Sequence, residues 1–218
     1  MKIFKFQVDE TYAKKNNELL RDSARLRNSG LIMGLLLIIG AAAVYMTVDA
    51  DWGFTIGLGM LLFGILVAIV GVAAARQVGT AQHLYDSYPL APAVVAEVNE
   101  RDMVLMALVN TNVDPGLPPR WAACLRTVTS VPGVKRTVGT KLPVAAVSGH
   151  RNNSDKEHWQ QVTPMPIAWG TPDAEVVTMA RKAIPEDQWQ KLDRARKRLN
   201  DVKATRYDLL VLLSHIHI

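Results

Sequence analysis

Two long uncharged apolar runs near the start of the chain limit what it can fold into more than any other feature. Residues 30–48 contain 19 residues without a charged side chain, and residues 52–75 contain 24. The hydrocarbon core of a bilayer is about 30 Å thick, and a helix of roughly 20 apolar residues crosses it. We therefore predict a hairpin of two transmembrane helices over residues 30–76. The 143 residues after residue 75 are enough for one further folded domain.

Charged residues flank the two runs unevenly. Arg25 and Arg27 precede the first run and Arg76 follows the second, whereas residues 49–51 between them contain two aspartates and no basic residue. Basic residues near membrane ends are retained in the cytoplasm, so we expect a multi-pass protein of the plasma (inner) membrane with both termini cytoplasmic. Trp52 is placed to anchor the outer interface, where indole rings favour the headgroup level.

A cleaved secretory signal is the competing interpretation of the first run, because residues 40–43 are small enough for a cleavage site. Against it, about thirty charged and polar residues precede the run, and a second apolar run follows. The single cysteine, Cys124, cannot form a disulfide within the chain. It fits a reducing cytoplasmic location for the C-terminal domain.

Small residues repeat along one side of the second run. The repeat consists of Gly57, Leu61, Gly64, Ala68, Gly71 and Ala75. Spacings of four and three place these residues on one helix face, the seam, and small residues there allow another helix to approach closely. The seam either packs against the first helix, where Gly30, Gly34 and Ala41 are a weaker counterpart, or also docks a helix of another protein. Neither run contains Asp, Glu, Lys, Arg or His, which argues against a transporter or channel.

Residues 1–29 form a predicted cytoplasmic arm. Residues 9–28 combine leucines with many charges and could form a helix lying along the headgroups. A solvated segment that only directs membrane insertion is the favoured interpretation.

After a polar juncture at residues 77–92, which ends in two prolines, residues 93–218 read as a β-rich domain. Strands are predicted at residues 93–98, 103–109, 121–131, 142–148 and 161–169. Their spacing favours a small, partly closed barrel or a curled sheet. The expected fold class is therefore an α+β membrane protein, with a helical hairpin, a β-rich cytoplasmic domain and C-terminal helices.

Two helices should follow the strands. Thr171 is placed to cap the first, and the second starts after Ile184 and Pro185. The second helix carries one apolar stripe that would cover the sheet, made of Trp189, Leu192, Leu199 and Val202. The last apolar run, residues 209–213, either continues this helix or adds a strand.

No motif in the chain indicates catalysis. It has no phosphate-binding glycine loop, no paired cysteines and no His-x-x-x-His pair. Cys124 lies in a predicted strand and reads as a core residue, since a nucleophile needs a base such as His150 or His158. His215 and His217 could ligate a metal, but a frayed chain end is the favoured interpretation. We predict no enzyme, no cofactor and no metal site.

A basic cluster near the C-terminus is the remaining charged feature. It consists of Arg194, Arg196, Lys197 and Arg198. The excess of basic over acidic residues after Arg76 is mild, so a solvated face beside an anionic membrane is favoured over a nucleic-acid site. Lipid is an expected partner and nucleic acid is not.

Four segments carry a resemblance to known proteins: YPLAP at 88–92, WAACLRTV at 121–128, PMPIAWGT at 164–171 and AIPEDQW at 183–189. With the tight hairpin, they resemble an uncharacterised family of actinobacterial two-pass membrane proteins. The chain also looks like a small accessory subunit of the actinobacterial cytochrome bcc–aa3 respiratory supercomplex. That resemblance implies a protein without haem or copper, held by its helices against the cytochrome subunits, whose other domain braces the inner face.

Two functions therefore stand as hypotheses. The first is a non-catalytic accessory or structural subunit that docks on integral membrane subunits through its hairpin. The alternative is a membrane-tethered cytoplasmic domain that senses a ligand or lipid, with the hairpin as a tether only. An enzyme with a scattered site is the third and weakest interpretation.

Overall fold

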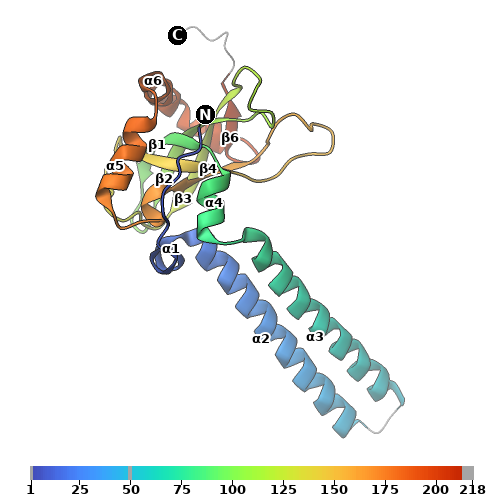
Figure 1. Ribbon diagram of the computed structural model, residues 1–218. Coiled ribbons are helices and arrows are strands. Elements are labelled where there is room, and N and C mark those ends of the chain that lie inside the picture. Colours follow the sequence, from blue (N-terminus) through green and yellow to red (C-terminus); the bar gives the residue numbers. More distant parts are fainter. Residues whose placement is uncertain (1, 49–50, 213–218) are drawn as a thin grey trace. The chain divides into compact units, whose positions relative to one another are not determined.

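The computed structural model describes residues 2–48 and 51–212, and the chain divides into two compact units (Figure 1). The hairpin unit is Glu18–Thr80. The sheet unit combines Met1–Asn17 with Ala81–Ile218. The hairpin is thus an insertion between two parts of one folded unit.

The hairpin unit contains the two predicted helices, α2 (Glu18–Thr47) and α3 (Asp51–Val78). Both are long and apolar enough to cross a membrane. Helix α2 starts twelve residues before the uncharged run, because its charged first turns are still good helix formers. Large apolar side chains remain exposed along both helices, whereas a soluble helix pair would bury them.

The sheet unit is built on six antiparallel strands in the order β5-β4-β1-β2-β3-β6. The strands are β1 (Leu90–Val98), β2 (Met103–Asn110), β3 (Trp121–Val128), β4 (Lys141–Ser148), β5 (Val162–Pro166) and β6 (Leu209–Val211). The sheet curls into a half-barrel, so that β3 and β5 come into contact although they are not neighbours in it. Arg126 of β3 donates from Nη1 to the carbonyl oxygen of Pro164 in β5, at 3.4 Å. The curled-sheet prediction is confirmed.

Most predicted strands agree with the structure, and the differences have local causes. The last predicted strand, 161–169, stops at Pro166 and continues as a short 3-10 helix, Ile167–Trp169. Of residues 209–213, the described part forms β6, which pairs with β3. The strand alternative is therefore correct there. Residues 213–218, which include His215 and His217, lie outside the described residues.

Strand β1 starts at Leu90, three residues earlier than predicted, because a proline is accommodated inside it. Pro92 pairs with Pro143 of β4. Pairing of β1 with β2 begins only at Ala93, and pairing of β4 with β5 only at Val144. Proline has no N–H group to donate. Because neither proline is paired on its other side, no backbone hydrogen bond between strands is lost.

The C-terminal helices are α5 (Ala174–Ala183), α6 (Glu186–Ala195) and α7 (Leu199–Lys203). Asp173, not Thr171, caps α5, accepting from the Glu175 N–H at 2.8 Å. Thr171 instead accepts from the Asp173 N–H at 3.1 Å. The predicted second helix is interrupted by a 3-10 turn at Arg196–Arg198, but its stripe still faces the sheet. Trp189, Leu192 and Val202 are buried, and Leu199 is half-buried.

The N-terminal arm differs most from the prediction. Residues 2–17 do not form a continuous headgroup helix with 18–28 but belong to the sheet unit. Helix α1 (Glu10–Asn16) ends at the extended residue Asn17, which is fully buried and donates to the sulfur of Met165 at 3.2 Å. The Leu90 N–H donates to the carbonyl oxygen of Lys2 at 2.8 Å, and the Asp9 N–H to that of Gly170 at 3.0 Å.

The predicted juncture is likewise part of the sheet unit, because it forms helix α4 (Ala81–Ser87), which the arm covers. Gln82 of α4 accepts from the Val8 N–H at 2.9 Å and donates to the Phe6 carbonyl oxygen at 3.0 Å. The rings of Phe6 and Tyr85 meet edge to face at 5.1 Å. The two compact units thus meet after Asn17 and before Ala81, whereas the predicted segments end at residues 29, 76 and 92.

We predict that Gly170→Ala destabilises the sheet unit, because an added Cβ would lie 2.7 Å from Cε2 of Tyr85 and 3.0 Å from Cζ of Phe6. Overpacking of this kind costs about 1–3 kcal/mol. Four of the five tryptophans lie in the sheet unit, so a tryptophan-fluorescence melt of the full chain in detergent reports on it. Gly59→Ala, on open surface, is the matched control. Equal melting of the two variants would contradict the packing of the arm.

Candidate interaction surfaces

The seam of small residues lies between the two helices of the hairpin. A Cβ added to Gly64 would lie 2.9 Å from the carbonyl oxygen of Gly34, and one added to Gly71 would lie 3.1 Å from Cα of Gly30. At these points the two backbones touch without intervening side chains. Close approach of this kind increases dispersion contact, which drives helix association in lipid.

The rest of the seam follows the same face. A Cβ on Gly57 would lie 3.2 Å from the carbonyl oxygen of Ala41, and Leu61, Ala68 and Ala75 are half-buried. The seam and its predicted counterpart thus pack on each other. Helix α2 therefore covers the seam, which is not open to a helix of another protein. The short connection between the two helices makes α2 the nearest partner of α3.

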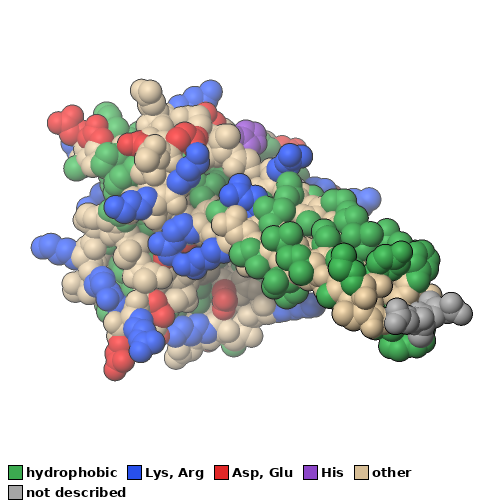
Figure 2. Space-filling view, turned by 90° about the horizontal axis from the view of Figure 1, so that it is seen from below, with side chains coloured by type: hydrophobic (Ala, Val, Ile, Leu, Met, Phe, Trp, Pro, Cys, Tyr) green, Lys and Arg blue, Asp and Glu red, His purple; other side chains and the backbone are tan. Residues whose placement is uncertain are grey.

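The outer faces of the hairpin carry the large side chains (Figure 2). Exposed large side chains on α2 and α3 include Ile32, Leu35, Leu36, Ile39, Tyr45, Met46, Phe54, Leu62, Phe63, Ile69 and Val70. In the described part of the sheet unit, exposed large apolar side chains are limited to Ile3, Leu117, Val138 and Met179. The hairpin is therefore the main apolar surface of the described chain.

The predicted interface residues lie on the surface of the hairpin. Arg25, Arg27 and Arg76 are exposed. A Cβ on Gly71 would lie 3.6 Å from the Arg27 carbonyl oxygen, so Arg27 and Arg76 belong to the same end of the helix pair. Trp52 is 59% exposed at the start of α3, toward the other end.

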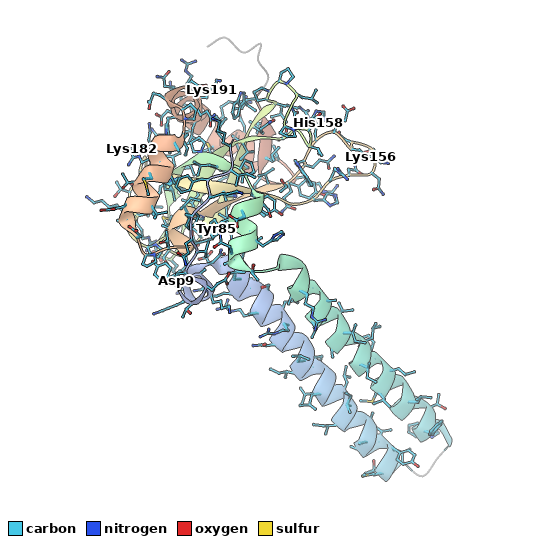
Figure 3. All side chains as sticks on the ribbon, in the orientation of Figure 1. Asp9, Tyr85, Lys156, His158, Lys182 and Lys191 are labelled. Carbon is cyan, nitrogen blue, oxygen red and sulfur yellow. The ribbon has the colours of Figure 1, made fainter. Side chains whose placement is uncertain are left out.

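A groove of about 730 Å³ lies in the sheet unit where α5 meets α6. Its lining includes Lys141, Arg181, Lys182 and Trp189 (Figure 3 labels Lys182). Lys141 Nζ lies 2.7 Å from Oδ2 of Asp193 and 5.6 Å from the centre of the Trp189 ring. The carboxylate of Glu186 also lines the groove, but the three basic side chains outnumber it and favour an anionic group. The sequence did not predict this groove, because its basic residues come from β4 and α5, which are far apart in the chain.

Buried polar contacts join β3, α4 and the 3-10 helix after β5. Tyr85, labelled in Figure 3, donates its hydroxyl to the Pro166 carbonyl oxygen at 2.8 Å. Burial raises the pKa of this phenol, so it stays a neutral donor. Trp169 donates to the Ser130 carbonyl oxygen at 3.0 Å, and the Arg126 guanidinium lies 4.9 Å from its ring centre. These contacts connect β3 and α4 with the segment at the end of β5, across the half-barrel.

The side chains considered for chemistry occupy structural positions. Cys124 is fully buried in β3 and hydrogen-bonded to the backbone of Ala107. His150 stacks on Tyr207 at 5.6 Å, and Nδ1 of His158 lies 3.0 Å from Oδ1 of Asp155. Residues 2–48 and 51–212 contain no group of three or more His, Cys, Asp or Glu side chains that could hold a metal ion.

Cys124 is predicted to resist alkylation in the folded protein. Burial raises the pKa of its thiol to about 12, so the reactive thiolate is scarce at pH 8. Iodoacetamide at pH 8, followed by mass spectrometry, should leave the native chain unmodified and label it once after denaturation. Labelling of the native protein at a rate comparable with the denatured chain would show that β3 is open to solvent.

Gly64→Leu is predicted to separate α2 from α3, because a Cβ there already meets the Gly34 backbone. Spin labels at the exposed positions Leu36 and Leu62 should then give a longer and broader distance distribution by pulsed electron resonance. Gly59→Leu is the matched control, since its added Cβ meets nothing within 4 Å. An unchanged distribution in Gly64→Leu would refute the backbone contact.

Comparisons with known proteins agree with this architecture. A solved structure from Corynebacterium diphtheriae, described as "a putative membrane protein", is 52% identical, with a TM-score of 0.55. The match covers 56% of this chain and 99% of that one. No relative was found among curated proteins. Because this relative comes from an actinobacterium, the predicted actinobacterial family is supported, whereas a link to the supercomplex is not.

Residues 76–200 match the family described as "Protein of unknown function (DUF3239)". The match covers more than half of the chain and includes five of the six strands together with α5 and α6. The chain therefore belongs to the DUF3239 family.

Proposed function

We propose that this protein is a non-catalytic accessory subunit of a larger membrane complex, anchored by α2 and α3. One observation carries the proposal. After the small-residue faces of the two helices have packed on each other, rows of large apolar side chains stay exposed along both helices. These outer faces can dock on integral membrane subunits, with lipid filling the rest of the surface.

The charges at the two ends of the hairpin support an orientation. Arg25, Arg27 and Arg76 lie at the end from which the chain continues into the sheet unit on both sides. Basic residues favour the cytoplasmic side, so we place the sheet unit and both termini in the cytoplasm. The membrane that we propose is the plasma (inner) membrane, since its inner face is the cytoplasmic side that this orientation requires.

For the partner we propose the cytochrome bcc–aa3 respiratory supercomplex of actinobacteria. Support comes from the resemblance of the sequence to its small accessory subunits and from the Corynebacterium relative described as "a putative membrane protein". In this role the hairpin contacts the cytochrome subunits, and the sheet unit braces their cytoplasmic face.

The groove between α5 and α6 favours a second candidate, a tethered domain that senses an anionic ligand. Arg181 and Lys182 line the groove, and the structure gives neither an ion-pair partner among the described residues. A sensor needs no partner subunit. A ligand that fills the groove should raise the melting temperature of the full chain.

A pull-down in mild detergent tests the proposed function. The full chain carries a tag at one terminus, and the eluate from native membranes is examined by mass spectrometry and for haem absorption. We expect cytochrome subunits in stoichiometric amount with haem bands. An unrelated two-helix membrane protein with the same tag is the control. Repeated recovery of the chain alone, from membranes whose supercomplex survives the detergent, would reject the accessory role and favour the sensor.

A further inference from the structure

An apolar notch on the hairpin surface ends at an arginine. The notch has a volume of about 530 Å³ and lies within the hairpin unit, between one residue of α2 and two turns of α3. It is lined by Leu31, Ala68, Ile69, Val72, Ala73 and Arg76. Its depth has a local cause, since alanines occupy positions 68 and 73, and Gly30 and Gly71 bring the helix backbones together beside it.

From these observations we infer that the notch binds one anionic phospholipid, with an acyl chain along Ala68–Ala73 and the phosphate at the Arg76 guanidinium. The inference goes beyond the proposed function and requires only that the hairpin is inserted in a membrane. It would hold for an accessory subunit and for a tethered sensor alike.

The length of the notch matches an acyl chain in one leaflet. Eight residues separate Ala68 from Arg76, which is about 12 Å of helix at 1.5 Å per residue. Half of a hydrocarbon core of about 30 Å is about 15 Å. The notch thus runs from the interface to near the bilayer midplane, the depth that one lipid tail occupies.

The same length disfavours a helix of another protein as the occupant. Helices pack by setting ridges of side chains into grooves, and this notch ends at Ala68 after about two turns of α3. Further along α3, toward Trp52, the exposed side chains are the larger Ile65, Leu62 and Leu58. A flexible acyl chain fits a short notch of this kind, and a rigid helix does not.

The charge at the interfacial end favours an anionic headgroup. Arg76 is exposed, and none of the ion pairs among the described residues involves it. Arg27 lies at the same end of the hairpin and also takes part in no such ion pair, whereas Arg25 is paired with Asp22 at 3.6 Å. An arginine near a membrane surface that has no ion-pair partner in the protein strengthens the binding of anionic lipid about fivefold.

The experiment titrates the full delipidated chain in detergent with phosphatidylglycerol or phosphatidylcholine and counts bound lipids by native mass spectrometry. We expect one phosphatidylglycerol per chain, bound more tightly than phosphatidylcholine. Arg76→Gln should weaken phosphatidylglycerol about fivefold and phosphatidylcholine clearly less, because the choline cation offsets the phosphate charge in phosphatidylcholine. Ala73→Phe should displace both lipids, because its ring fills the notch.

Two matched variants serve as controls. Gly59→Leu adds apolar volume to α3 outside the notch, and Lys156→Gln removes one positive charge at an exposed position of the sheet unit. Both should bind lipid as the unaltered chain does, and circular dichroism verifies that every variant keeps its helices. Equal binding of the two lipids by the unaltered chain would overturn the inference. The inference would also be overturned if Ala73→Phe bound lipid as tightly as Gly59→Leu does.

Discussion

Direct backbone contact between α2 and α3 determines which surfaces the hairpin presents. Gly34 and Gly64 meet at one crossing point and Gly30 and Gly71 at another, with no side chain between them. Once the helices pack in this way, most of their large apolar side chains stay exposed, although Leu37 and Ile38 are half-buried beside Gly64. The outward faces carry the proposed docking surface, and the narrow spacing leaves the notch that ends at Arg76. A bulky residue at Gly64 would change both surfaces together.

The insertion of the hairpin into the sheet unit has a second consequence. The chain leaves this unit after Asn17 and returns to it at Ala81, so both ends of the hairpin connect to one folded body. The arm holds its place through Gln82 and through the rings of Phe6 and Tyr85. A fragment that begins at residue 90 would lack the arm and α4, and it would expose the buried Trp169 region that they help to cover.

Local patterns predicted much of the fold because their physical causes are local. Apolar length identified the two helices, and short apolar runs separated by turn residues identified most of the strands. The arm was misread because its charges suggested a solvated segment. Its signal was the alternation of Phe4, Phe6 and Val8, which is typical of an extended segment with one buried side. The Pro92–Pro143 pair could not be foreseen, since it depends on which strands are neighbours.

By itself, the sequence determined the two candidate spans, the small-residue seam and a β-rich domain with a helical stripe, because length, spacing and period are properties of a local segment. Tertiary structure alone decided that the seam faces α2, that the arm belongs to the sheet unit, and where the groove and the notch lie. Such features depend on residues far apart in the chain, such as Leu31 beside Ala68, or Lys141 beside Trp189. Only packing brings these side chains together, because each makes its contacts after the elements between them have folded.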